Sequence, residues 1–281
     1  MKTRKIKRIS TSAPTMEGAG VHLHRVFGFS NETDFDPFLL LDDSRSDNPS
    51  EYLSGFPWHP HRGIETITYV LQGDVEHGDS LGNSGIISSG DVQWMTAGSG
   101  IIHQEMPKGD SGGSMHGFQL WANLPAKDKM MAPRYRDISS GQIPEVTLDG
   151  GITAKIIAGT LGNVFGPVSD VVIDPLYLDC TVPPDKEFRQ RANPEYTVFI
   201  YVIGGTGSIG EEDLVNKNLV LFDLGDEIVV SSGSDGMRFL LLSGKPLREP
   251  IAWRGPIVMN SQEQLDLAFR EFHAGNFIKH Q

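Results

Sequence analysis

The chain has 281 residues, with 24 Lys and Arg against 36 Asp and Glu, and a single cysteine, Cys180. The formal net charge of −12 argues against broad nucleic-acid binding through phosphate neutralisation, and one cysteine excludes an intramolecular disulfide. No apolar stretch has the length of a membrane span or of a signal-peptide core. We therefore expect a soluble cytoplasmic protein, with the nucleus as an alternative if it is eukaryotic, without direct nucleic-acid or membrane contacts.

The first fifty residues predict short strands separated by polar turns. Residues 2–8 carry a basic cluster around a possible edge strand, which we interpret as a solvated strand or tail. Residues 21–29 have the pattern of a strand, and residues 38–41 are an apolar run of buried-strand length. The polar residues 44–54 indicate a loop, which we place near a barrel mouth.

Unusual chemistry is concentrated between residues 55 and 107. His59 and His61 alternate along one predicted strand, and His103 and Glu105 alternate along another. Alternate residues of a strand share a face, so three imidazoles and one carboxylate converge if the two strands meet across a barrel interior. Such a nitrogen and oxygen set, with coordination positions left open, is typical of an oxygen-handling metal.

Other histidines allow a plainer interpretation, in which H-x-H marks a half-exposed strand face. His22 and His24 have the same spacing but no second His-x-Glu set, so we expect them on a solvated strand. His77 follows a glycine turn among acidic residues, and we interpret it as part of a surface loop. His116 is either a hydrogen-bond partner of a metal ligand or a satisfied core histidine.

Residues 55–107 resemble the metal-site segment of pirins, which are two-domain cupins. The first cupin motif, G-x(5)-H-x-H-x(3,4)-E-x(6)-G, is matched with altered spacing at both outer glycines. Three residues separate Gly55 from His59, and seven separate Glu65 from Gly73. The resemblance extends from about residue 36 to the C-terminus.

The second cupin motif, G-x(5)-P-x-G-x(2)-H-x(3)-N, is matched loosely, because Thr96 replaces its proline. A glutamate two places after the motif histidine is a pirin feature. The resemblance implies that the metal ligands are His59, His61, His103 and Glu105.

The second half of the chain predicts another barrel. We expect strands at 152–158, 171–177, 196–203, 219–223, 227–230 and 239–242. The segment 225–233 mirrors 90–98, which indicates a diverged repeat. Aligning the two halves puts Arg238 and Leu240 opposite His103 and Glu105, and Gln190 and Ala192 opposite His59 and His61. This barrel is therefore expected to be degenerate and without metal, as in pirins.

Ser261 begins a predicted helix, because the next residues form a capping box and apolar residues recur at helical spacing up to Gly275. We predict an all-β protein with two cupin (jelly-roll-like) β-barrels in tandem and a short C-terminal helix. The predicted domains are 1–135, the metal-binding barrel, and 136–281, the degenerate barrel with the helix.

The resemblance implies a quercetin 2,3-dioxygenase, which opens a flavonol ring with O2 at a mononuclear non-haem metal. Fe(II) is expected, with Mn, Ni, Co, Cu or Zn as alternatives. Glu105 is the expected base for the flavonol hydroxyl, and aromatic side chains could wall the pocket: Phe56, Trp58, Tyr69 and Trp94. The main alternative is a metal- or redox-dependent regulatory protein that binds a transcription factor or other protein partner without turnover. A different cupin reaction, such as isomerisation or hydrolysis, is a third possibility.

Overall fold

The computed structural model describes residues 1–30 and 33–280, and nearly all of its regular structure is antiparallel β-sheet. The α-helix found in these residues, α1 (Gln262–His273), begins at Ser261, whose side chain accepts a hydrogen bond from the Gln264 backbone amide. The predicted fold class, all-β with a short C-terminal helix, is confirmed. None of the helices described has the length and apolar character needed to cross a lipid bilayer.

The chain forms two compact units. The larger unit comprises Ala13–Asp34, Phe38–Ser140 and Leu247–Gln281, and the smaller unit comprises Met1–Ser12, Phe35–Pro37 and Gly141–Pro246. These units differ from the predicted domains 1–135 and 136–281 at both chain ends. Residues 1–12 join the smaller unit, and the C-terminal helix joins the larger one.

Strand pairing explains where the N-terminal end lies. Strand β1 (Ile6–Thr11) pairs with β21 (Asn218–Phe222) of the smaller unit. Arg4, expected in a solvated tail, is only 2% exposed. Its guanidinium donates to backbone carbonyls of the smaller unit, at Gly225, Tyr196, Asp223 and Asn193. Arg4 therefore anchors the basic segment to this unit, whereas Lys2, Lys5 and Lys7 are exposed.

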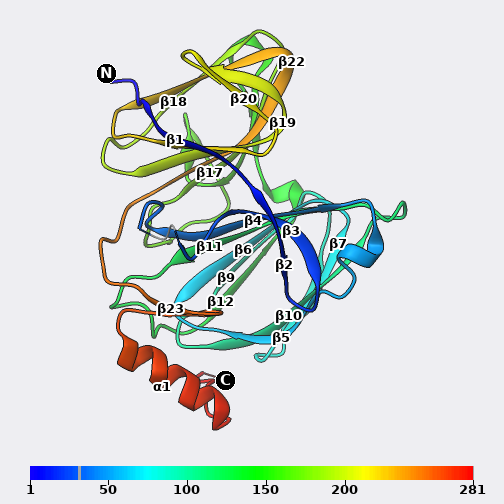
Figure 1. The fold of residues 1–281 in the computed structure, drawn as a ribbon, viewed down its shortest axis with the longest axis vertical. Coiled ribbons are helices and arrows are strands. Elements are labelled where there is room, and N and C mark those ends of the chain that lie inside the picture. The colour runs from blue at the N-terminus through cyan, green and yellow to red at the C-terminus, as the bar shows by residue number, and fades with distance from the viewer. Residues whose placement is uncertain (31–32, 281) are drawn as a thin grey trace. The chain divides into compact units, whose positions relative to one another are not determined.

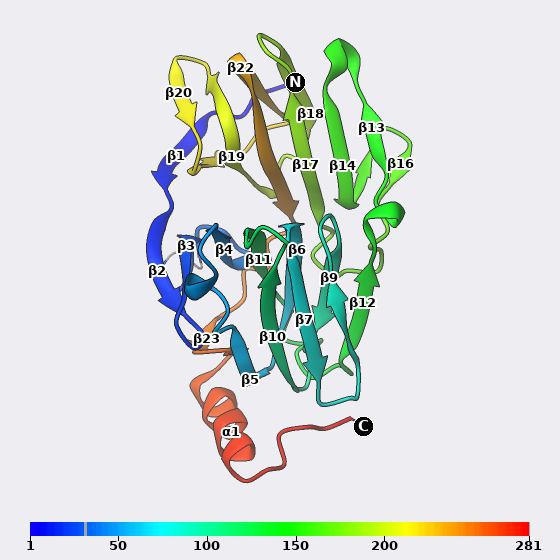
Figure 2. The ribbon, with the colours of Figure 1, turned by 90° about the vertical axis from the view of Figure 1, so that its right-hand side faces the viewer.

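The larger unit contains two main sheets. A seven-stranded sheet has the order β12-β9-β6-β11-β4-β3-β2, and a four-stranded sheet has the order β5-β10-β7-β8 (Figures 1 and 2). The bounds are β2 (Ala13–Glu17), β3 (Val21–Phe27), β4 (Phe38–Ser46), β5 (Phe56–His61), β6 (Ile64–Gln72), β7 (Asp74–Asp79), β8 (Ser84–Ile87), β9 (Val92–Thr96), β10 (Ile101–Gly109), β11 (Met115–Asn123) and β12 (Arg134–Ile138). A C-terminal hairpin of β23 (Ala252–Arg254) and β24 (Ile257–Met259) contacts α1.

The smaller unit is built on one sheet of nine strands in the described residues. Its order is β1-β21-β19-β22-β17-β14-β13, with β18 on β22 and β20 on β19. The further bounds are β13 (Glu145–Thr147), β14 (Thr153–Ala158), β15 (Thr160–Leu161), β16 (Val164–Phe165), β17 (Leu176–Val182), β18 (Glu187–Arg191), β19 (Thr197–Ile209), β20 (Glu212–Val215) and β22 (Glu227–Gly244). Short 3-10 helices span Pro49–Glu51, Ser140–Gln142 and Asp149–Gly151.

Two strand predictions in the smaller unit need correction. The strands expected at 227–230 and 239–242 are one continuous strand, β22. The strand expected at 171–177 begins only at Leu176, because residues 171–174 form a turn in which the Asp174 amide donates to the Val171 carbonyl and Asp174 has a positive φ of 47°. The apolar faces of these strands form one cluster that includes Leu178, Ile200 and Phe239.

Replacing Arg4 by Met tests the anchoring of the N-terminal segment. The variant removes one buried and three partly buried hydrogen bonds from the guanidinium to backbone carbonyls, so we expect the free energy of unfolding to fall by about 3 kcal/mol. Urea denaturation measures this, with Lys5→Met as the control because Lys5 is exposed. Equal stability of the two variants would contradict the anchoring role.

Candidate metal centre

The three predicted histidine ligands come from neighbouring strands. His59 and His61 end β5, and the antiparallel β10 places His103 opposite His59 and Ile101 opposite His61. Because alternate side chains of a strand share a face, this register brings all three imidazoles to one side. His61 and His103 are each only 1% exposed, whereas His59 is half-buried.

The three rings converge closely. Their centroids are 4.4 Å apart for His59 and His103, 4.8 Å for His59 and His61, and 5.0 Å for His61 and His103. One donor nitrogen from each ring lies within 4.8 Å of the other two. Within the described residues, His59, His61 and His103 form the cluster of side chains that could hold a metal ion.

Backbone carbonyls determine the tautomers of two of these histidines. Nδ1 of His59 lies 2.9 Å from the carbonyl oxygen of Pro57, and Nδ1 of His61 lies 3.0 Å from that of Pro256. A carbonyl only accepts, so each Nδ1 carries a proton and donates it. Burial lowers the pKa of both imidazoles, which keeps them neutral. Each Nε2 is therefore an unprotonated lone pair.

These two lone pairs face each other, because the Nε2 atoms of His59 and His61 are 3.1 Å apart. Neither has a proton to donate, so the contact is repulsive unless a cation lies between them. Two nitrogens bound to one metal at about 2.1 Å, at a right angle, are about 3.0 Å apart. The observed separation fits a shared cation.

His103 completes the set. Both of its ring nitrogens are buried and neither has a hydrogen-bond partner within the described residues. Burial, reinforced by the neighbouring His61 and His59, lowers its pKa well below the usual value. Leaving a buried polar group unsatisfied is costly, and coordination of a cation would remove that cost. The donor set therefore fits a metal ion.

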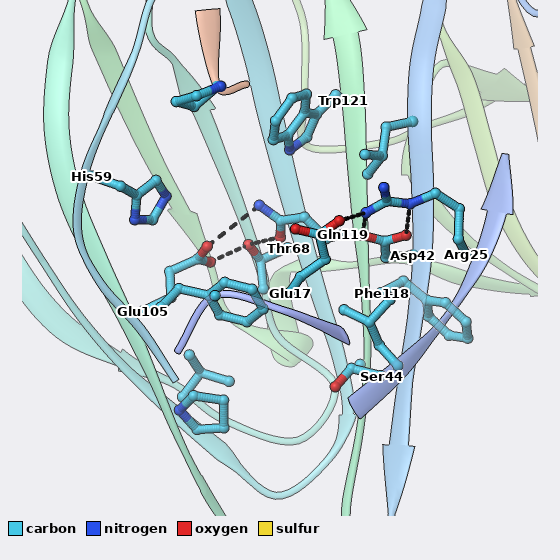
Figure 3. A pocket seen from close by; sticks show the side chains of 18 of the residues that line it. Glu17, Arg25, Asp42, Ser44, His59, Thr68, Glu105, Phe118, Gln119 and Trp121 are labelled. Atoms are coloured by element: carbon cyan, nitrogen blue, oxygen red, sulfur yellow. Dashed lines mark hydrogen bonds and ion pairs between the residues drawn. The ribbon is translucent and has the colours of Figure 1, made fainter. Parts of the chain in front are cut away.

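Glu105, the fourth predicted ligand, lies outside the histidine group and is turned toward Thr68 and Gln119 (Figure 3). Thr68 Oγ1 has two acceptors, Glu105 Oε1 at 2.6 Å and Gln119 Oε1 at 2.7 Å. The single hydroxyl proton of Thr68 can be donated to only one of these two oxygens. A protonated Glu105 resolves the conflict, since its own O–H then donates to Thr68. Burial raises the pKa of Glu105, which favours that protonated form.

Three other predicted residues are placed away from the centre. His77 is not in a surface loop but in β7, where it is 5% exposed and stacks on Tyr135 with a centroid separation of 5.5 Å. Nε2 of His116 lies 3.2 Å from Asp43 Oδ1, and β11 turns Gln119 and Trp121 rather than His116 toward the pocket. His22 is exposed, as expected of a solvated strand.

A cavity of about 620 Å³ opens beside His59, His61 and Glu105. Its size is in the range of ligand pockets. Of the aromatic residues expected to wall it, Phe56 does so, whereas Trp58 is 55% exposed and Tyr69 and Trp94 are buried elsewhere. The walls are instead mostly apolar residues from other segments: Leu23, Phe29, Leu40, Phe118, Trp121 and Trp253. Trp253 belongs to the C-terminal hairpin and had no sequence signal.

The pocket has a second polar region, which lies opposite His59 (Figure 3). Arg25 donates to both carboxylate oxygens of Asp42 at 2.8 Å and lies 3.0 Å from Glu17. Because the two carboxylates of Glu17 and Asp42 face the single guanidinium of Arg25, this end of the pocket is acidic. It suits a ligand with hydroxyl donors better than an anionic one.

Comparison with known proteins identifies the family. Family models described as "Pirin" and "Pirin C-terminal cupin domain" match residues 20–122 and 177–278. A pirin-like protein of Caulobacter vibrioides is 42% identical over 278 residues, covering 99% of this chain and 100% of the relative. The chain belongs to the pirin family. It has the tandem cupin fold predicted above.

Other similar proteins carry an enzyme name. A Pseudomonas aeruginosa protein, provisionally named a quercetin 2,3-dioxygenase, is 42% identical and aligns over 97% of each chain. A crystal structure of quercetin 2,3-dioxygenase from Acinetobacter baumannii has a TM-score of 0.89 and 30% identity, with 98% of each chain covered. These names belong to those proteins and motivate the proposal below.

The lowered histidine pKa values predict how the metal-free protein responds to acid. The unfolded chain binds protons at its imidazoles below about pH 6.5, whereas the folded state keeps His103 neutral. The unfolded state then holds more protons, so the free energy of unfolding falls as pH drops below 6.5. Between pH 7.5 and 5.5, we expect the free energy of unfolding of His103→Leu to fall by about 1.4 kcal/mol less than that of the wild type. Urea denaturation in chelator measures it; an unchanged pH dependence would contradict the burial of a neutral His103.

Proposed function

We propose that this protein is a metal-dependent dioxygenase of the quercetin 2,3-dioxygenase type. The observation that carries the proposal is the pair of unprotonated Nε2 atoms of His59 and His61 facing each other at 3.1 Å beside a largely apolar pocket. His59, His61, His103 and Glu105 are the proposed ligands. Fe(II) is the proposed metal, and Mn, Ni, Co, Cu or Zn can occupy the same donors.

The proposed substrates are a flavonol and O2. A bound divalent metal would lower the pKa of the flavonol 3-hydroxyl and hold it next to O2. In this reaction both oxygen atoms of O2 enter the product, and carbon 3 leaves as carbon monoxide. The flat rings of such a substrate match the walls formed by Phe118, Trp121 and Trp253, and its remote hydroxyls can donate to the acidic end of the pocket.

Glu105 is the proposed base for the 3-hydroxyl proton. A carboxylate cannot be a tight ligand and a free base at once, and Thr68 and Gln119 offer it a position away from the histidines. In that position Glu105 can hold the transferred proton, because burial raises its pKa and Thr68 accepts the O–H. We thus propose that hydrogen bonds to Thr68 and Gln119 hold the protonated Glu105 away from the histidines.

Glu105→Gln tests this role, because glutamine keeps the shape but cannot take the proton. We expect turnover of quercetin to fall about 100-fold or more while the three histidines still hold metal. Oxygen consumption and metal content are measured on the same samples, with Glu76→Gln as the control because Glu76 is exposed on β7. Turnover at the wild-type rate with metal bound would contradict the base role.

Reconstitution tests the activity itself. Metal-free protein is loaded separately with Fe(II), Mn(II), Ni(II), Co(II), Cu(II) or Zn(II), and O2 uptake and carbon monoxide release are followed with quercetin. We expect one carbon monoxide per O2 consumed with at least one of these metals. Stoichiometric metal binding without turnover for all six would contradict the dioxygenase and favour a metal-dependent regulatory protein that binds a protein partner.

A further inference from the structure

The C-terminal segment, defined here as residues 247–280, contributes directly to the surroundings of a predicted metal ligand. The carbonyl of Pro256, in the turn between β23 and β24, accepts the proton of His61 Nδ1 at 3.0 Å. Trp253, Gly255 and Pro256 also line the pocket. A stretch about 200 residues away in sequence therefore sets the tautomer of His61 and closes part of the cavity.

Arg62, the residue after this ligand, attaches the segment at a second point. Its side chain is 2% exposed and donates to Glu271 Oε2 and to the carbonyl of Phe277, both at 2.7 Å. The guanidinium carbon also lies 4.2 Å from the centroid of the Phe277 ring. A buried guanidinium needs these partners, so the position of α1 and of the residues after it is coupled to the strand end at Arg62.

Lys129 attaches the segment at a third point. Its buried amine donates to the carbonyls of Gly63 at 2.9 Å and Val258 at 3.0 Å, and to Asn123 Oδ1 at 2.7 Å. The Val258 amide donates to the carbonyl of Arg62 at 3.1 Å. Gly63 has a φ of +78°, and a Cβ there would lie 2.0 Å from the Val258 oxygen. Only glycine permits this close approach of the two backbones.

We propose that the C-terminal segment is the positioning element of His61, so that docking of the segment and binding of metal stabilise each other. This rests on the metal site of the proposed function. When the segment is docked, the Pro256 carbonyl holds the proton on Nδ1 and leaves Nε2 as the donor. When it is displaced, His61 loses this acceptor, and its ring is free to turn or to change tautomer. Coupling of this kind is reciprocal between the two binding events.

Glu271→Gln tests the coupling from a residue on α1 that is remote from the ligands. The change weakens the ion pair with buried Arg62 without altering any proposed ligand. We expect the dissociation constant for Co(II), measured by competition with a chromophoric chelator, to rise about tenfold. The visible spectrum of the Co(II)-loaded variant should also differ from wild type, because the orientation of His61 changes. A purely structural role would leave that spectrum unchanged.

Asp266→Asn is the matched control. It also removes a carboxylate charge from α1 and weakens an ion pair with an arginine, Arg254, but that pair is exposed. We expect its Co(II) affinity to stay within about twofold of wild type, since exposed pairs contribute little. Wild-type affinity and spectrum in Glu271→Gln, or equal losses in both variants, would overturn the proposal.

Hydrogen exchange of the wild-type protein tests the same coupling without substitution. We expect Co(II) to slow amide exchange in α1, while exchange in β18 of the smaller unit stays unchanged. Exchange in α1 that does not respond to bound Co(II) would overturn the proposal. A wild-type protein that binds no Co(II) would instead overturn the metal site, so the two failures are distinguishable.

Discussion

The structure of the centre depends on two backbone carbonyls that each fix a proton on an imidazole. Pro57 and Pro256 accept from Nδ1 of His59 and His61, and this leaves two Nε2 lone pairs 3.1 Å apart. Such an arrangement is unfavourable in the absence of a cation, and the buried, unpartnered His103 adds to that cost. The β-sheets of the larger unit hold the three rings in place and so oppose their separation. The sheets thus hold the three rings in a geometry that suits a bound cation, at a cost to the stability of the metal-free protein.

The two ends of the pocket carry different polar groups. The proposed ligands His59 and His61 and the proposed base Glu105 lie at one end, and the ion-paired acidic cluster of Arg25, Asp42 and Glu17 lies at the other. Apolar and aromatic side chains between them can exclude water, which strengthens electrostatic interactions at the metal end. Glu105 has hydrogen-bond partners away from the histidines, so the two roles proposed for it, ligand and base, would correspond to two positions of one side chain.

Strand alternation made much of this centre predictable. In a strand, the spacings His59-x-His61 and His103-x-Glu105 place each pair of side chains on a common face, and the observed β5–β10 register brings the histidines together. The all-β class and the helix at 262–273 followed from equally local signals. Thr68, Gln119 and the carbonyl of Pro256 could not be found in this way. Their contribution arises only from pairings between distant strands, and a backbone carbonyl has no signature in the sequence.

The errors have the same origin. His77 stands among polar residues, yet β7 pairs with β10 and buries it against Tyr135. The N-terminal residues were expected in the first domain, whereas hydrogen bonds made by Arg4 attach them to the smaller unit. Long-range backbone pairing and buried cations decided these positions, and a single sequence shows neither.

X-ray diffraction at the absorption edge of the metal, on crystals of the Fe(II)-loaded protein, tests the central claim most directly. The account predicts one anomalous peak per chain, about 2.1 Å from the Nε2 atoms of both His59 and His61 and from one ring nitrogen of His103. A peak at any other position, or crystals of metal-treated protein without a peak, would contradict it.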